Sequence, residues 1–378
     1  MGWVALRMLI GNRAKFLGII LGVTFAALLI AQQASIFCGL MLFTTSQIRD
    51  VQGAQIWVMD KNVAFVDDIK PMSEVELYRV RGVRGVDWAV RFYKGLSRAR
   101  LANGRFQQII LLGLDDASMV GAPIEMLVGS ISDLRRPDAI IMDVAGFREL
   151  WPGEPLAAGK VFEMNDRQAQ IVGICRSRPT FQTFPVVYTR YSQATMFAPQ
   201  ERKVMSFVLA NPQPGLSAEE VCKRITDQTG LQALTNDQFA WKTIDYYLRR
   251  TGIPVNFGIT VLLGFIVGTA IAGQTFYLFT IENLRQFGAL KAMGAGNLKL
   301  LGMIVLQATV VACISYSLGV GLAALFGRFA GTTSRLAFYM PWEVLWGTGA
   351  AVILISILSS LLCIRRVMVL EPAIVFQG

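Results

Sequence analysis

The chain has 378 residues, of which 53% are hydrophobic and only 16% are charged, and its formal net charge at pH 7 is +10. This composition excludes an ordinary soluble domain and indicates a membrane protein that also has a water-exposed part. The positive charge does not indicate nucleic-acid binding, because part of it flanks the apolar segments and no nucleic-acid-binding motif accompanies it.

The segment 1–15 has the pattern of an interfacial amphipathic helix. Trp3, Leu6 and Leu9 recur at helical spacing, whereas Arg7 lies on another face. The alternative reading is that this segment is only a slightly polar start of the first membrane span.

Four segments are long and apolar enough to cross a bilayer, which takes about 20 helical residues. They cover 16–43, 256–280, 300–326 and 344–364. The first is too long for the apolar part of a cleavable signal peptide and lacks a small-residue cleavage site, so we expect it to remain in the membrane.

Basic residues beside the spans predict the orientation of the chain, because cytoplasmic loops are enriched in lysine and arginine. With four crossings, three basic groups fall on one side, which we expect to be the cytoplasm. Both termini, the segment 281–299 and the tail 365–378 then face the cytoplasm, and 44–255 and the short loop 327–343 face the opposite side. The basic residues are Arg7, Arg13, Lys15, Arg285, Lys291, Lys299, Arg365 and Arg366.

The segment 44–255 alternates between strand-like and helix-like pieces and predicts one α+β domain. Ser73 and Ser217 are each followed three residues later by a glutamate, which is the capping-box pattern of a helix start, and Gly230 is a helix-stop signal. Pro254 is expected to end or kink a helical stalk that returns to the membrane. Short apolar or β-branched runs predict strands at 54–60, 107–114, 138–143, 169–175, 184–189 and 204–211.

The spans contain few polar residues. No acidic or basic residue lies deep in a span, which argues against a proton-coupled carrier or an ion channel. Gly18 and Gly22, and likewise Gly264 and Gly268, are four residues apart, the spacing at which helices pack closely. Glycines without a packing role are the alternative.

Several kinds of chemistry are missing from the sequence. The chain has no histidine, so the commonest general base and metal ligand is absent. It has no phosphate-binding G-x-x-x-x-G-K-[ST] loop and no cysteine cluster with metal-ligand spacing, so we expect no enzyme activity, no cofactor and no metal site. Cys175 and Cys222 share the exterior domain, and the sequence leaves open a disulfide between them.

The stretch QFGALKAMGAGNLKLLGMIV, residues 286–305, combines glycines and lysines between two apolar spans. It resembles the cytoplasmic segment of ABC transporter permeases of the MacB/FtsX class, which reads as a Glu- and Arg-rich run followed by I-G-x-L-[KR]-A-[ML]-G-A. Residues 288–295 carry this core, and Leu370 and Pro372 match the ending typical of the class. The N-terminal sequence and the turn DVQGAQIWVMD are closest to the DevC-type branch.

The resemblance implies an α-helical membrane protein with four transmembrane helices and a large α+β periplasmic domain inserted between helices 1 and 2. It also implies that 281–299 is a coupling helix that docks on an ATPase. Gly294 and Gly296 would then form the turn into the third span, and the lysines would face lipid headgroups or an acidic groove of the partner. A loop that only fixes topology is the alternative. The coupling residues so assigned are Glu282, Arg285, Gly288, Ala289, Leu290, Lys291, Ala292, Met293, Gly294, Ala295 and Lys299.

The chain departs from the class in two ways. It lacks the nucleotide-binding domain fused to MacB, so two copies of a separate cytosolic ATPase would carry ATP and Mg²⁺. The basic cluster before the core is reduced to Arg285.

The function implied by the resemblance is that of a permease subunit, in a homodimer in the bacterial inner membrane. It would work in a tripartite efflux system with a HlyD-type periplasmic adaptor and a TolC-like outer-membrane channel, exporting a hydrophobic or glycolipid-like substrate. Two alternatives are an FtsX-like transmitter that activates cell-wall hydrolases and a LolCE-like permease that releases lipoproteins.

Overall fold

The computed structural model describes residues 2–198, 204–333 and 336–368. The chain divides into two compact units, one made of Met1–Leu40 with Gly252–Gly378 and the other of Met41–Thr251. Leu370 and Pro372, which carry part of the family resemblance, lie outside the described residues, as does most of the tail 365–378.

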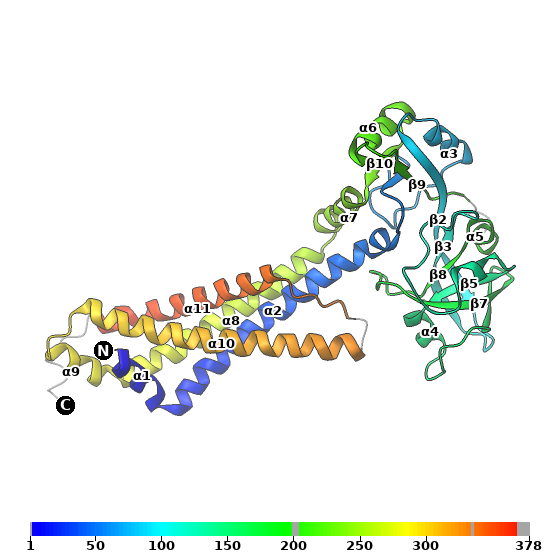
Figure 1. Ribbon diagram of the computed structural model, residues 1–378. Coiled ribbons are helices and arrows are strands. Elements are labelled where there is room, and N and C mark those ends of the chain that lie inside the picture. Colours follow the sequence, from blue (N-terminus) through cyan, green and yellow to red (C-terminus); the bar gives the residue numbers. More distant parts are fainter. Residues whose placement is uncertain (1, 199–203, 334–335, 369–378) are drawn as a thin grey trace. The chain divides into compact units, whose positions relative to one another are not determined.

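The first unit is a bundle of long helices (Figure 1). Four of its helices are long and apolar enough to cross a membrane. Each begins before its predicted span and ends after it, and the short helices α1 and α9 lie at the same end of the bundle (Figure 1). The helices are α1 (Gly2–Gly11), α2 (Arg13–Asp50), α8 (Ile253–Glu282), α9 (Leu284–Ala292), α10 (Asn297–Thr333) and α11 (Trp342–Met368).

Close contact between α2 and α8 depends on glycine. A Cβ built on Gly268 would come within 2.3 Å of the Ala26 Cβ, and one built on Gly22 within 2.4 Å of the Ile271 Cγ2. Gly264 and Gly18 leave more space, with a Cβ 3.4 Å from the Leu29 Cβ and 3.9 Å from the Thr275 Cγ2 respectively. Removing the side chain at the tight positions lets the two helix backbones approach, which is how small residues promote packing in membranes.

Polar side chains of α10 bond to the backbone of other helices. Gln307 Nε2 donates to the carbonyl of Ala5 at 2.8 Å, and Ser315 Oγ donates to the carbonyl of Ile20 at 3.2 Å. Both side chains are buried. Such groups need a partner in an apolar interior, and here they fix α10 against α1 and α2.

The second unit contains a mixed sheet with helices packed on it. Along the described strands the order is β10-β1-β9-β2-β3-β8-β5-β7-β4, and β6 pairs with β2 and β7. Most pairs are antiparallel, but β3 pairs parallel with β8 and β5 pairs parallel with β7. The strands are β1 (Ile56–Met59), β2 (Val86–Arg100), β3 (Phe106–Leu114), β4 (Glu125–Val128), β5 (Ala139–Asp143), β6 (Val161–Met164), β7 (Arg167–Arg176), β8 (Val186–Arg190), β9 (Phe207–Pro212) and β10 (Gln232–Thr235).

Helices cover this sheet and close its core. One aromatic cluster surrounds the buried Trp57, whose ring lies 5.2 Å from that of Phe207 and 5.5 Å from that of Phe239. The helices are α3 (Glu74–Arg81), η1 (Ile131–Arg135), α4 (Val144–Leu150), α5 (Tyr191–Phe197), α6 (Ala218–Thr229) and α7 (Asn236–Arg250).

The strand β2 joins the two halves of the sheet. Its first part, Val86–Phe92, pairs with β9, and its second part, from Tyr93 to Arg100, pairs with β3. The six strand candidates in the sequence coincide with β1, β3, β5, β7, β8 and β9. The sequence patterns do not predict β2, because charged side chains interrupt its apolar residues, or the short strands β4, β6 and β10.

Several local expectations need correction. Ser73 precedes α3 but makes no capping hydrogen bond, and Glu76 instead pairs with Arg79 at 2.8 Å. In contrast, Ser217 Oγ accepts from the Glu220 N–H, and Gly230 ends α6 with a φ of 72°. Near Pro254 the returning helix ends and is not kinked: α7 ends at Arg250, and Pro254 lies in the first turn of α8, where its missing N–H costs nothing.

Cys175 and Cys222 are free thiols and do not form the disulfide that the sequence left open. Cys175 lies on β7 and Cys222 on α6, and both are buried. They pack in two different hydrophobic clusters, so each thiol acts as a small apolar side chain.

Candidate coupling site

The turn between α8 and α9 is built around one asparagine. Asn283 ends α8 and begins α9, and its side-chain N–H₂ donates to the carbonyl of Phe279 at 2.8 Å. Its own carbonyl accepts from the N–H of Phe287 at 3.0 Å. The buried side chain thus closes one helix end while the main chain starts the next helix.

The short helix α9 has a buried and an exposed face. Phe287 and Gly288 are buried against the bundle, whereas Arg285, Ala289 and Ala292 are exposed. The exposed face of α9 therefore consists of one cationic residue, Arg285, and two small residues, Ala289 and Ala292.

The end of α9 is a Schellman turn, which reverses the chain toward α10. The N–H of Gly294 donates to the carbonyl of Lys291 at 3.1 Å, and the N–H of Ala295 donates to that of Leu290 at 3.0 Å. Gly294 has a φ of 89°, a conformation that glycine adopts without strain. Gly296 was also expected to form this turn, but its φ lies outside the left-handed region.

Two apolar side chains near this turn are strongly exposed. Met293 is 75% exposed and Leu298 is 83% exposed, whereas Ala295 between them is buried. Leu298 does not stand out in the sequence, because the apolar residues around it look like the start of the third span.

The structure separates the predicted coupling residues by exposure. Glu282, Arg285, Ala289, Ala292, Met293, Gly294 and Lys299 are exposed, Leu290 and Lys291 are partly buried, and Gly288 and Ala295 are buried. A partner could contact the first group directly, whereas the buried pair shapes the helix and its turn.

The N-terminal part of the chain, α1 and the start of α2, also takes part in this site. Lys15 at the start of α2 forms an ion pair with Glu282, and Asn12 between the two helices donates to the same carboxylate at 3.4 Å. The Arg7 guanidinium lies over the Trp3 ring, 5.6 Å from its centroid. A groove of about 580 Å³ runs between α1 and the α8–α9 turn. Its lining residues are Trp3, Val4, Arg7, Met8, Gly11, Asn12, Glu282, Asn283 and Gln286.

The exposed groups of this site suit the binding of another surface. Among the described residues, no group of three or more His, Cys, Asp or Glu side chains is placed to hold a metal ion. The exposed groups of α9 and its turn are a guanidinium, small side chains and two apolar side chains, which recognise a complementary surface.

Residues 258–372 match the family described as FtsX-like permease C-terminal. This part of the chain is similar to an FtsX-like permease domain. This domain starts within α8 and includes α9, the Schellman turn and α10. The candidate coupling residues from Glu282 to Lys299 all lie inside it.

Curated relatives share part of the chain. An uncharacterized ABC transporter permease of Mycobacterium bovis is 31% identical over 120 residues, which are 32% of this chain and 33% of that relative. One of Mycobacterium tuberculosis is 31% identical over 138 residues, which are 35% of this chain and 37% of the relative. The match thus spans about a third of the length of these relatives.

Two solved structures are also similar at low sequence identity. The extracellular domain of the noncanonical ABC-type transporter YknZ from Gram-positive bacteria has a TM-score of 0.36 and 14% identity, over 48% of this chain and 98% of that one. The periplasmic region of MacB from Actinobacillus actinomycetemcomitans has a TM-score of 0.37 and 12% identity, over 54% of this chain and 96% of that one.

Proposed function

We propose that this protein is the permease subunit of an ABC transporter of the MacB/FtsX class, and that α9 with its Schellman turn docks on a separate cytosolic ATPase. The observation that carries the proposal is the exposed, glycine-terminated helix α9 inside the FtsX-like permease domain, at the end of a bundle of four membrane-length helices. The relatives named as ABC transporter permeases support it.

The exposed side chains give the docking step an energetic basis. Burying Met293 and Leu298 against a partner would contribute roughly 1.5–3 kcal/mol for each side chain. Arg285 and Lys299, both exposed, would direct the approach of an acidic groove. The apolar pair supplies affinity, and the cations supply orientation.

The wider assembly follows from the family resemblance and is also proposed. Two copies of the chain pair in the bacterial inner membrane, with both termini in the cytoplasm. Two ATPase subunits, which hold ATP and Mg²⁺, bind to them on the cytoplasmic side. Their motion passes through the helices to the domain between α2 and α8. A HlyD-type adaptor and a TolC-like channel complete an exporter of the DevC type for a hydrophobic or glycolipid-like substrate. No charged residue lies deep in the predicted spans, which favours a protein that transmits motion and not one with a hydrophilic pathway through the membrane.

The coupling role is tested with the chain in lipid nanodiscs and an ATPase encoded beside it. Ala292→Trp places a bulky group on the exposed face of α9, and Ala324→Trp places the same group on an exposed position of α10 as the control. We expect Ala292→Trp to insert normally but to lose at least tenfold in ATPase binding, while Ala324→Trp binds as wild type does. Equal binding by both variants would overturn the docking role of α9.

A further inference from the structure

A pocket lies where the strand β2 changes partners in the second unit. β2 pairs with β9 up to Phe92 and with β3 from Tyr93 onward. At this junction the Ser206 hydroxyl accepts from the Lys94 N–H at 3.0 Å and donates to the Lys94 carbonyl at 2.8 Å. The Ser206 hydroxyl thus bonds to both the N–H and the carbonyl of Lys94. Both main-chain groups therefore have partners at the point where β2 leaves β9.

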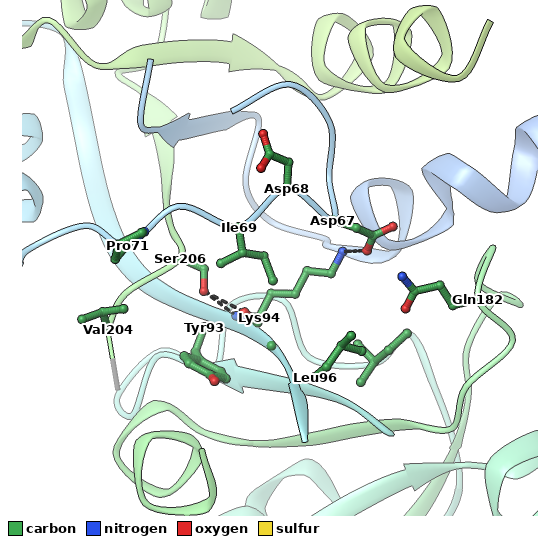
Figure 2. Close-up of a pocket in the computed structure, with 12 residues that line it drawn as sticks. Asp67, Asp68, Ile69, Pro71, Tyr93, Lys94, Leu96, Gln182, Val204 and Ser206 are labelled. Atoms are coloured by element: carbon green, nitrogen blue, oxygen red, sulfur yellow. Dashed lines mark hydrogen bonds and ion pairs between the residues drawn. The ribbon is translucent and has the colours of Figure 1, made fainter. Parts of the chain in front are cut away.

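The space between the halves is a pocket of about 440 Å³, within the range of small-molecule sites. Figure 2 shows that its lining is divided: the Lys94 ammonium, Asp67 and Gln182 gather at one end, and Pro71, Val204 and Tyr93 at the other. Leu96 and Ile110 add to its apolar wall. The pocket therefore has a polar end and an apolar end.

The charges at the polar end neutralise one another. Lys94 has a side chain only 3% exposed, and its ammonium donates to Asp67 at 2.5 Å and to the carbonyl of Val66 at 2.9 Å. Asp68, which also lines the pocket, pairs with Lys70 at 3.0 Å. An ionic ligand would enter without a countercharge or would have to break a buried pair, and either event is costly.

One polar atom at this end lacks a partner. Gln182 Oε1 is buried and accepts no hydrogen bond from the described residues. In Figure 2 its amide points toward the Lys94–Asp67 pair. A buried acceptor without a donor costs free energy, which a ligand hydroxyl or amide N–H would recover.

We propose that this pocket binds a small uncharged amphiphile, with an alkyl chain against Leu96, Ile110 and Val204 and a hydroxyl or amide head that donates to Gln182 Oε1. The apolar end of the pocket would bind the alkyl chain, and the polar end would bind the head. Because Lys94 and Asp67 already pair with each other, an ionic head is disfavoured. This inference stands apart from the coupling role of α9, because every lining residue belongs to the second unit.

The test uses the full chain in lipid nanodiscs and a photoactivatable octanol, an octan-1-ol that carries a diazirine. We expect light to attach it to peptides that contain Leu96 or Ile110, as read by mass spectrometry. Octanamide should compete at concentrations about tenfold lower than octanoate or octylamine, which have the same chain and an ionic head. Labelling confined to the membrane-length helices, or stronger competition by an ionic compound, would overturn the proposal.

Two variants locate the binding within the pocket. Val204→Trp fills the apolar end from a position that is 37% exposed, so it does not disturb the core, and it should abolish pocket labelling. Gln182→Leu removes the acceptor and should weaken octanamide competition about tenfold. Gln168→Leu, at an exposed position on β7, is the matched control and should behave as wild type. Unchanged labelling in Val204→Trp, or unchanged octanamide competition in Gln182→Leu, would also overturn the proposal.

Discussion

Gly268 on α8 lies directly against Ala26 on α2, with only 2.3 Å between the Ala26 Cβ and the position that a Cβ of residue 268 would take. The neighbouring atom is the Cβ of an alanine, which cannot move without its backbone. The contact therefore requires glycine, and it determines how closely α2 and α8 pack.

Replacing Gly268 with alanine should destabilise the helix bundle. Gly268→Ala forces α2 and α8 apart, and we expect a loss of about 1–3 kcal/mol in the free energy of unfolding. Gly258→Ala in the same helix is the control, because no atom lies within 4 Å of its added Cβ, and alanine there should be neutral or stabilising. Unfolding by denaturing detergent, followed by tryptophan fluorescence, measures both. Equal stability of the two variants would show that the close contact is unimportant.

The turn after α9 can be tested with two glycines that differ in backbone conformation. Gly294→Ala must hold alanine at a φ of 89°, which costs ~1–2 kcal/mol, and we expect faster hydrogen exchange of the Ala295 amide. Gly296→Ala adds its Cβ to open space at an ordinary φ and should leave the turn unchanged. Hydrogen exchange followed by mass spectrometry measures how well the turn protects the Ala295 amide. Under the proposed coupling role, only Gly294→Ala should weaken stimulation of the ATPase.

Cys222 should resist alkylation in the folded protein. Burial, with a smaller contribution from the Glu219 carboxylate, raises the pKa of the Cys222 thiol to about 12 from its ordinary value of 9.0. At pH 8 its thiolate population is then about a thousandfold lower than that of an unperturbed thiol, and alkylation slows in proportion. Iodoacetamide labelling of the native and the urea-unfolded protein, without reductant, measures this. Failure of the unfolded Cys175 and Cys222 to react would indicate a disulfide instead.

The stability of the second unit should depend on pH through Lys94. Burial lowers the pKa of Lys94 below its usual 10.5, although the Asp67 carboxylate opposes the shift. The unfolded chain then binds more protons than the folded chain between the two pKa values, so the free energy of unfolding rises with pH across that interval. Below the folded pKa both states are protonated, and the penalty of the buried ammonium is constant.

A paired replacement isolates this effect. Lys94→Met combined with Asp67→Asn removes the buried ammonium without leaving an unpaired carboxylate. Thermal unfolding followed by fluorescence, from pH 8 upward, should show the wild type gaining stability relative to this variant. Parallel pH profiles would mean that Lys94 does not titrate differently in the folded and unfolded chains.

Local sequence patterns predicted many of the elements. The four membrane-length helices and six of the strands follow from runs of apolar residues, because length and periodicity are properties of neighbouring residues. The same patterns failed at β2, where Arg91 and the buried Lys94 place charged side chains among the apolar residues. They also failed at Ser73, where the capping pattern is present but the hydrogen bond is not.

The candidate coupling site was only partly visible in the sequence. The glycine-rich motif located α9, and Gly294 fulfilled its expected role in the turn. The exposure of Leu298 was not visible, because the apolar sequence around it looks like the start of the third span. The contact of α1 with α10 was not visible either, because Gln307 and Ala5 lie 302 positions apart.

The amino-acid sequence by itself determined the membrane spans, their order around an α+β domain, and the family motif between the second and third spans. These depend on composition and short-range spacing. Only the tertiary structure decided that Gly268 meets Ala26, that Cys175 and Cys222 remain apart, and that Lys94 pairs with Asp67 in a pocket at the junction of the sheet. Each of these depends on how whole elements pack and not on the residues beside it in the chain.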